Sequence, residues 1–523
     1  MAAAPALPDL GTLDVDALRS LLLAQQGELV AQQERLLSRD SEIEHLKLVI
    51  AKLRRMIFGA KSERSTREIE QLELKLEELE AVRAERTVVE HASSREETAK
   101  PSRRPLPGHL PREVHTHMPL TESCPDCGGE LRKFGEDVSE MLEYVPSRFK
   151  VIRHVRPKLS CRACEKVVEA AAPSRPIDRG IPGPGLLAHV LVSKYADHLP
   201  LYRQSEIYAR EGVDLDRSTL ADWVGSASKL LRPLVDQVRQ HVVAAAKLHA
   251  DDTPVPVLAP GMGRTKTGRL WTYVRDDRPA ADTTPPAVWF AYTPDRKGEH
   301  PRQHLTDFTG TLQADGYAGF HHLYDTGRIR EAACWAHVRR KFFDIESAHR
   351  SAIAAEAIRR IAELYAIESE VRGKPPDLRR EIRQSRARPL LDDLQSWFEK
   401  ILSTLSKKSE TAIAIRYALS RWRALSRYLD DGAIEIDNNS AERALRAVCL
   451  GRKNFLFAGS DDGGERAAAI YTLTGSARLN GLDPELYLRH VLERIADHPI
   501  TRIGELLPWN LADLCAHPTV THS

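Results

Sequence analysis

The sequence predicts a multidomain α/β protein, and three observations support this prediction. The chain has 523 residues, which is too long for one hydrophobic core, and its 42% apolar and 29% charged content is ordinary for a soluble globular protein. Its apolar residues follow a seven-residue repeat near the N-terminus and a period of two from residue 246. Two Cys-x-x-Cys pairs lie between these regions. We therefore expect a coiled coil, a metal-binding module and an α/β domain, in that order.

The overall charge does not by itself indicate a nucleic-acid partner. Lys+Arg 76 against Asp+Glu 74 gives a formal charge of +2, so DNA would have to bind to local basic patches. The sequence has neither a run of 18 apolar residues nor the basic and apolar segments of a signal peptide at its start. We therefore expect a cytoplasmic protein that does not contact a membrane.

Residues 1–90 are expected to form a leucine-zipper-like coiled coil. Apolar residues recur every seven positions at Val15, Leu22, Leu29, Leu36, Ile43, Ile50 and Ile57. A second column, three residues further on, is apolar at its ends and polar in its middle, which favours a fixed register at a cost in stability. These two columns form a narrow apolar stripe that needs a partner helix, which favours a homo-oligomer. An intramolecular hairpin or a single amphipathic helix is the alternative. Residues 91–120, rich in Pro, Arg and Ser, are predicted to be an exposed linker.

Residues 121–170 are expected to form a zinc ribbon. Their four cysteines stand in two Cys-x-x-Cys pairs, Cys124 with Cys127 and Cys161 with Cys164. Two such pairs supply the four thiolates of a tetrahedral structural zinc site, and the residues between them alternate as strands do. Free thiols or a redox pair are the alternative. A filled tetrahedral site leaves no position for catalysis, so one structural Zn²⁺ is expected.

Residues 180–240 are predicted to be helical. A turn at Gly212, a cap at Ser218 and a following helix with Trp223 are typical of a helix-turn-helix, which would make this a DNA-binding region. Helical pairs that bind nothing share the same pattern, so both interpretations stay open at this point.

From residue 246 the pattern predicts strands in "KLHADDTPVPVL", "GRLWTYVRDD", "AVWFAYTPD" and "GTLQADGYAGF", and a fifth strand that enters a basic helix in "IREAACWAHVRRKFF". With intervening helices the order is β-β-β-α-β-α-β-α, the order of a ribonuclease-H-like fold. In that fold the first and fourth strands are neighbours. An aspartate of the first strand, Asp251 or Asp252, would therefore lie beside Asp315 at the end of the fourth.

Two adjacent carboxylates repel each other unless a cation lies between them, and oxygen ligands of this kind favour Mg²⁺ or Mn²⁺. A third acid must come from a later helix. Glu442 in "EIDNNSAERALR" is a candidate, although with Asn439 it also fits a capping box at a helix start. Each acid alone has a structural explanation as a strand end, a turn or a cap. Together, on these elements, they favour a catalytic site with two metal ions.

At these residues the sequence resembles the transposases of the insertion-sequence-66 type, which belong to the DDE superfamily. The matching segments, in the family's order, are "FGAKSER", "CPDCGG", "LVSKYADHLPLYRQ", "HADDTPV", "QADGYAGF", "CWAHVRRKFF", "EIDNNSAERALR" and "GRKNFLFAGSDDGGERAA". The resemblance implies that Asp251, Asp315 and Glu442 hold the catalytic ions. It also implies DNA cleavage at the ends of an insertion sequence, followed by strand transfer to target DNA.

The resemblance extends to the organisation of the chain and to its partners. It implies a DDE catalytic domain over residues 245–480 with a helical insertion at about 350–425, a C-terminal tail at 481–523, and small companion proteins of the same element. Candidate DNA contacts are His337, Arg340, Arg443, Arg446, Arg452 and Lys453. An inactive DNA-binding regulator and a nuclease of the same fold are the alternatives. A glycoside hydrolase fits poorly, because it explains neither the cysteine pairs nor the basic clusters.

Overall fold

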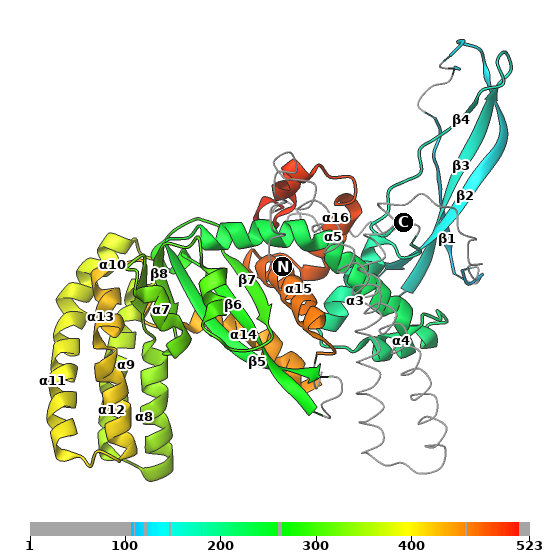
Figure 1. Ribbon diagram of the computed structural model, residues 1–523. Helices are drawn as coiled ribbons and strands as arrows, with labels where there is room; N and C mark the ends of the chain where they lie inside the picture. Colours follow the sequence, from blue (N-terminus) through cyan, green and yellow to red (C-terminus); the bar gives the residue numbers. More distant parts are fainter. Residues whose placement is uncertain are drawn as a thin grey trace, which may run out of the picture.

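The computed structural model describes residues 106–108, 110–119, 123–124, 126–145, 148–178, 180–259, 264–454 and 458–511. The expected coiled coil over residues 1–90 lies outside the described residues. None of the helices in the described ranges is long and apolar enough to cross a bilayer. The long β2–β3 hairpin and the helices α8–α13 lie at opposite ends of the molecule in Figure 1, with a mixed sheet and its covering helices between them.

The ribbon near the N-terminus is a small sheet in which β3 is central. Its strands are β1 (Arg112–Thr116), β2 (Leu131–Val145), β3 (Arg148–Cys161) and β4 (Val167–Glu169). β2 and β4 are antiparallel to β3, and β1 is parallel to it. β1 lies in the stretch that the sequence predicts to be a linker. That prediction is wrong for these five residues, since each pairs with a residue of β3.

Three helices follow the ribbon: α3 (Pro184–Tyr195), α4 (Leu201–Arg210) and α5 (Arg217–Val243). Gly212 has a φ of +80° and forms the expected turn, but α5 begins directly after Asp216, so Ser218 lies inside its first turn. From Leu220 to Ser228 every residue of α5 is buried except the half-buried Asp222. α5 as a whole packs against β7, α15, α3 and α4. The stretch from Leu220 to Ser228 of the expected recognition helix is therefore part of the core.

The central sheet has the strand order β7-β6-β5-β8-β9. Its strands are β5 (Lys247–Ala259), β6 (Arg264–Arg275), β7 (Ala287–Thr293), β8 (Gly310–Ala314) and β9 (Ile329–Ala332). β5, β6 and β7 form an antiparallel meander, whereas β8 and β9 run parallel to β5. The short helices α6 (Glu299–His304) and α7 (His321–Tyr324) connect the parallel part. The fourth strand ends at Ala314, one residue earlier than expected, because Asp315 opens the following turn.

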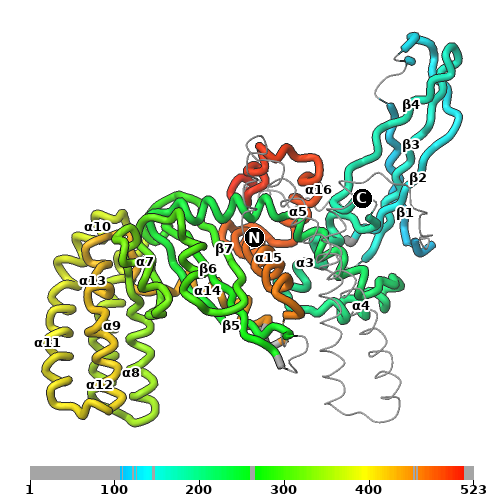
Figure 2. Tube along the Cα trace, viewed as in Figure 1, coloured from blue at the N-terminus to red at the C-terminus, as the bar shows by residue number. Residues whose placement is uncertain are grey.

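Helices cover this sheet after the fifth strand. They are α14 (Asn439–Asn454), which packs on β5 and β6, α15 (Asp461–Leu479), which packs on β7 and α5, and α16 (Pro484–Arg494), which packs on α3. The tube view shows α14 and α15 against the sheet (Figure 2). Since Tyr487, Leu488 and Val491 of α16 are fully buried, the segment predicted to be a C-terminal tail contributes to the core.

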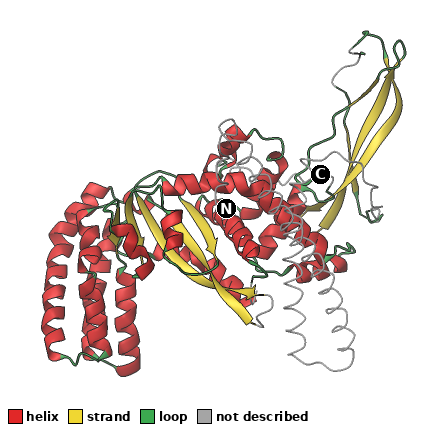
Figure 3. Cartoon of the chain, in the orientation of Figure 1, coloured by secondary structure: helices red, strands yellow, loops and turns green. Residues whose placement is uncertain are grey.

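A further set of helices forms a bundle with a core of its own, at the left of Figure 3. They are α8 (Trp335–His349), α9 (Ala352–Val371), α10 (Pro376–Ile382), α11 (Arg388–Thr404), α12 (Glu410–Ser420) and α13 (Trp422–Asp430). Phe342, Ile361 and Phe398 are fully buried in this second core. Residues 350–425 are thus helical, as the sequence predicts.

Candidate active site

Strand register brings the first two acids together. β5 and β8 are parallel, and Ala250 lies opposite Ala314 at the end of the shared ladder. Asp251 is the next residue of β5, and Asp315 is the first residue after β8. Glu442 comes from the first turn of α14, which packs on β5. All three acids therefore approach the same end of the β5–β8 pair from three separate parts of the chain.

The electrostatics of Asp251 reflect this arrangement. Burial is the largest cause that raises the pKa of Asp251, to about 7, and the negative charges of Asp315, Asp252 and Glu442 raise it further. Like charges disfavour ionisation of a carboxyl group, and a bound cation would favour it. The three acids do not form one tight cluster. No group of described residues whose ligand atoms all lie within 4.8 Å of one another contains all of them.

Asp252 has a different environment from Asp251. Successive side chains of a strand point to opposite faces, so only one of the two aspartates faces Glu442. The Asp252 carboxylate, 1% exposed, accepts hydrogen bonds from Arg296 at 2.7 Å and Arg269 at 3.0 Å. Two guanidinium groups already neutralise Asp252. The carboxylate of Asp252 is thus already paired with two arginines, whereas the charge of Glu442 acts on Asp251.

The helix that carries Glu442 does not begin as the sequence predicts. Asn439 was expected as its cap, but it is the first helical residue, and its backbone N–H donates to the carboxylate of Asp437 at 3.1 Å. The Glu442 carboxylate does not close a capping box, because it faces α8 instead. There it lies 3.8 Å from His337 Nδ1 and 3.9 Å from an Arg340 guanidinium nitrogen.

The predicted DNA contacts whose side chains the structure describes divide into two groups. His337 and Arg340 lie beside Glu442, so they are near the acids. Arg443 and Arg446 are exposed on α14, three positions apart, and Arg443 donates to the Ser440 hydroxyl at 3.1 Å. The side chains of Arg452 and Lys453 lie outside the described residues.

Sequence reasoning missed two buried amides that hold the segment before α14. Asn438 Nδ2 donates to the Ala250 carbonyl at 2.8 Å, and Gln313 Nε2 donates to the Glu435 carbonyl at 2.6 Å. Both side chains are fully buried. Asn438 thus links the residue before Asp251 to the start of the Glu442 helix, and Gln313 links β8 to the same segment. The paired asparagines of "DNN" were the available signal, but a pattern does not reveal a partner nearly two hundred residues away.

A second missed arrangement surrounds Glu442. Atoms of Cys334, His337 and Glu442 lie within 4.8 Å of one another. Cys334 precedes the first residue of α8, and its Sγ accepts the Asn438 backbone N–H at 3.2 Å. The C-x-x-H spacing at the start of a helix was the signal for this contact. Cys334 is 3% exposed, so it is a small buried residue with a polar contact in addition.

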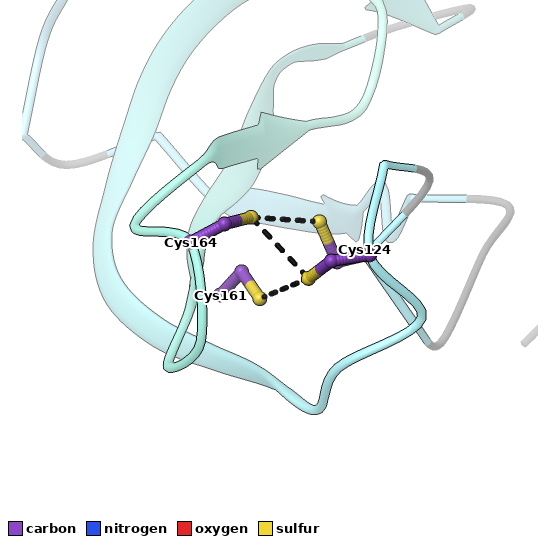
Figure 4. Close-up of side chains that lie close together, drawn as sticks. Cys124, Cys161 and Cys164 are labelled. Atoms are coloured by element: carbon purple, nitrogen blue, oxygen red, sulfur yellow. Dashed lines mark hydrogen bonds between the residues drawn. The ribbon is translucent and has the colours of Figure 1, made fainter.

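The four ribbon cysteines form one cluster, in which Figure 4 labels Cys124, Cys161 and Cys164. Cys124 and Cys164 Sγ are 3.3 Å apart, and Cys127 Sγ is 3.4 Å from both Cys161 and Cys164. A tetrahedral site with Zn–S bonds of about 2.3 Å would place sulfurs roughly 3.8 Å apart. The donor set and its spacing therefore fit a structural zinc ion.

The backbone folds around this cluster in two equivalent turns. Gly128 donates its N–H to the Cys124 carbonyl at 2.8 Å, and Glu165 donates to the Cys161 carbonyl at 2.9 Å. Both donors have positive φ, of 69° and 58°. A Cβ on Gly129 would lie 3.1 Å from Cys161 Sγ, so a larger residue would press on the cluster. In "CPDCGG", Gly128 thus allows the positive φ of the turn, and Gly129 leaves room beside the cysteine sulfurs.

Comparisons with known proteins agree with these features. Residues 179–466, more than half of the chain, match the model described as "Transposase IS66 family". Residues 121–165 match the zinc-finger binding domain of transposase IS66, residues 45–114 match "Transposase C of IS166 homeodomain", and residues 472–509 match the IS66 C-terminal element. The zinc-finger match and the four-cysteine cluster together support a structural zinc.

Three relatives from one bacterium match most of the chain. An uncharacterised protein of Sinorhizobium fredii is 44% identical over 488 residues, covering 89% of this chain and 88% of the relative. A second from the same organism is 41% identical over 534 residues, covering 96% and 97%. A third is 39% identical over 480 residues, covering 89% and 94%. With the family models matched in order along it, the chain belongs to the IS66 family of transposases.

Proposed function

We propose that this protein is a DDE transposase that cuts DNA at the ends of an insertion sequence and joins them to target DNA, with Asp251, Asp315 and Glu442 as the metal-binding carboxylates. The observation that carries this proposal is the β5–β8 register, which places Asp251 beside Asp315 while α14 brings Glu442 to the same strand. The proposal includes a ribonuclease-H-like core over residues 245–480. The strand order β7-β6-β5-β8-β9, with an antiparallel meander and two parallel strands, supports it.

The donor chemistry fits Mg²⁺ or Mn²⁺. All three proposed ligands are carboxylates, and hard oxygen donors are the ligands that these ions prefer. Burial is the largest cause that raises the pKa of Asp251, and the neighbouring negative charges add to it; a divalent cation would offset both by favouring the ionised carboxylate. Two bound ions would lower the pKa of the attacking hydroxyl and stabilise the departing oxygen.

The chain's own residues would mainly position and neutralise charge. Water attacks the phosphorus at the element end, the bond to the 3′-oxygen breaks, and that oxygen leaves as a free 3′-hydroxyl. The 3′-hydroxyl then attacks a phosphodiester of the target in a second displacement, so no protein nucleophile is needed. His337 and Arg340 of α8 lie 3.8 Å and 3.9 Å from the Glu442 carboxylate, and they would contact a DNA phosphate near the ions. The exposed Arg443 and Arg446 on α14 would contact the DNA backbone.

The other regions have proposed roles in the same reaction. The ribbon at 121–170 and the exposed surface of the 180–240 region would hold the element ends, and a coiled coil at 1–90 would pair protomers. Deletion of residues 1–90 should then lower self-association, which light scattering measures as the number of protomers in the assembly. We also propose that the protein acts in the bacterial cytosol, with small companion proteins of its element as further partners.

The test is cleavage and joining of labelled element-end DNA with Mg²⁺. The wild type should yield nicked ends and joined products, and Asp251→Asn should yield neither while still binding the DNA. Asp344→Asn, which changes an exposed acid of α8, is the control and should behave as the wild type. Cleavage without joining would favour a nuclease. DNA binding without any cleavage would favour an inactive regulator derived from a transposase.

A further inference from the structure

We propose that Arg421, between α12 and α13, is a positioning residue that holds Asp315 in place and so couples the helical bundle to the active site. The proposal rests on the function proposed for Asp315. It concerns a residue that contacts no substrate in the scheme above and that no sequence motif singled out.

The contacts of Arg421 join three separate elements. One guanidinium nitrogen donates to the Gly316 carbonyl at 2.9 Å, directly after Asp315, and the other donates to Glu331 Oε1 of β9 at 2.9 Å. The Arg421 side chain is 17% exposed, so these bonds are shielded from water. A planar guanidinium group can serve two acceptors in fixed directions, which an ammonium group cannot do. Arg421 therefore fixes the start of the Asp315 turn relative to the sheet edge.

Gly316 is shaped by this contact. A Cβ at this position would lie 2.7 Å from the Arg421 guanidinium carbon and 2.7 Å from its bonded nitrogen. The φ of Gly316 is outside the left-handed region, so its backbone conformation would also accept alanine. The glycine of "DGY" thus leaves room for the Arg421 guanidinium, which an added Cβ would displace, and the turn itself does not need it.

The same turn is also held by Arg296, in the loop after β7. Arg296 lies over the Tyr317 ring at 4.0 Å from its centroid, and the Tyr317 hydroxyl donates to the Arg296 carbonyl. Arg296 also binds Asp252 at 2.7 Å, which ties it to β5. Asp315 itself accepts the Tyr317 backbone N–H at 3.1 Å. A shift of this turn therefore changes the position of the Asp315 carboxylate directly.

Arg421 is the bundle's contribution to this arrangement. Nearby, Ala333 donates its N–H to the Ala424 carbonyl at 3.1 Å, and Arg427 donates to the Glu331 carbonyl at 2.6 Å. The α12–α13 junction is therefore bound to the end of β9 at several points. A displacement of the bundle would be transmitted through Arg421 to Gly316. This gives the helical insertion a role in setting the geometry of the site.

The test is a double-mutant cycle between Arg421 and Gly316 in the full-length protein. Arg421→Ala and Gly316→Ala should each lower the rate of Mg²⁺-dependent end cleavage by about tenfold or more, since small displacements in an active site have effects of that order. Each should also raise the Mg²⁺ concentration for half-maximal rate severalfold. The double variant should be no slower than Arg421→Ala, because loss of the guanidinium leaves space for the added methyl group.

Arg416→Ala is the matched control, since the Arg416 guanidinium bonds to the Lys407 carbonyl within the bundle. It should leave both the rate and the Mg²⁺ requirement unchanged. Thermal unfolding of every variant separates loss of positioning from loss of fold. If Arg421→Ala does not fold, Arg421→Lys replaces it, because lysine keeps the charge but not the two-acceptor geometry.

The experiments distinguish a failure of the function proposed for Asp315 from a failure of the positioning role proposed for Arg421. If the wild type does not cleave, or Asp315→Asn cleaves as the wild type does, the proposed function of Asp315 is wrong. If the wild type cleaves and Asp315→Asn does not, then a folded Arg421→Ala or Arg421→Lys variant with the wild-type rate and Mg²⁺ requirement overturns the positioning role alone. Strictly additive effects of Arg421→Ala and Gly316→Ala would also overturn it.

Discussion

Asn438 donates a hydrogen bond from its side-chain amide to the Ala250 carbonyl at 2.8 Å, and it is fully buried. Its Oδ1 lies 3.1 Å from His249 Nδ1, and its carbonyl accepts the N–H of Glu442 at 3.3 Å. One asparagine thus joins the strand residue before Asp251 to the helix turn that carries Glu442. The distance between two proposed ligands from distant parts of the chain depends on this side chain.

Replacement of Asn438 should therefore affect both stability and activity. Asn438→Ala leaves buried polar groups at Ala250 and His249 without their partner, which costs about 1–3 kcal/mol of unfolding free energy. Urea unfolding measures the loss, and end cleavage should fall with it. Asn439→Ala is the control, because the Asn439 amide bonds only to the neighbouring Asp437. Equal unfolding midpoints for the two variants would contradict the role given to Asn438.

The two glutamates of "EIDNNSAERALR" should respond differently to the same substitution. Glu442→Gln should abolish Mg²⁺-dependent cleavage and joining with little change in unfolding, because the half-exposed Glu442 makes only long contacts to His337 and Arg340. Glu435→Gln should instead lower the unfolding free energy by on the order of 3 kcal/mol, because Glu435 forms a buried ion pair with Arg379 at 2.8 Å.

Activity assays and thermal melts on both variants provide the comparison, and each glutamate serves as the other's control. Persistent cleavage by Glu442→Gln would remove Glu442 from the ligand set. Asp437 would then be the acid to test next, since the carboxylate of Glu435 is already bound by Arg379.

The elements that the sequence predicts well are those with a local signal. The change of period at residue 246 reflects strands with a buried face, and the Cys-x-x-Cys spacing reflects two turns that each close over four residues. The observed order of strands and helices after residue 246 is the predicted one. The side chains that set the geometry have no such signal. Arg296, Arg421 and Asn438 act on residues between 44 and 188 positions away, and a single sequence does not encode such pairings visibly.

The expectations that the structure corrects also concern features that depend on contacts between residues far apart in the sequence. β1 lies in a polar, proline-rich stretch, and it is a strand only because β3 offers it a parallel edge. The apolar residues of α5 are compatible with a recognition helix and with a core helix, and only the structure shows that its middle is buried against neighbouring elements. Asn439 is the first helical residue of α14 and not its cap, because Asn438 precedes the helix and the Asp437 carboxylate accepts the Asn439 N–H.

The ribbon should hold one zinc ion per chain. Cys124→Ser should lose it, because a hydroxyl is a poor replacement for one of four clustered thiolates. Metal analysis of the purified protein measures the stoichiometry. Cys449→Ser, outside the cluster, is the control and should retain the zinc. Limited proteolysis should then cut the ribbon of Cys124→Ser faster, since binding of a structural zinc stabilises the fold that holds it. A wild-type protein without zinc would remove the site.

Acidification should destabilise the fold through His249. Burial is the largest cause that lowers the pKa of His249, to about 3, so the folded protein holds this side chain neutral. The unfolded chain takes up a proton near its ordinary pKa of about 6.5, and stability is therefore full above pH 6.5 and is lost as the pH falls from there towards 3. Between pH 7 and 5.5 this one group should cost about 1 kcal/mol.

Urea unfolding of the wild type and of His249→Gln at the two pH values isolates this contribution. Glutamine carries no titrating group and can still bond to Asn438, so the variant should be less stable at pH 7 but should lose about 1 kcal/mol less on acidification. Other histidines titrate equally in both proteins and cancel in the difference. An identical loss in both proteins would mean that His249 takes up its proton as readily in the fold as in the unfolded chain, and it would contradict the neutral state given to this buried side chain.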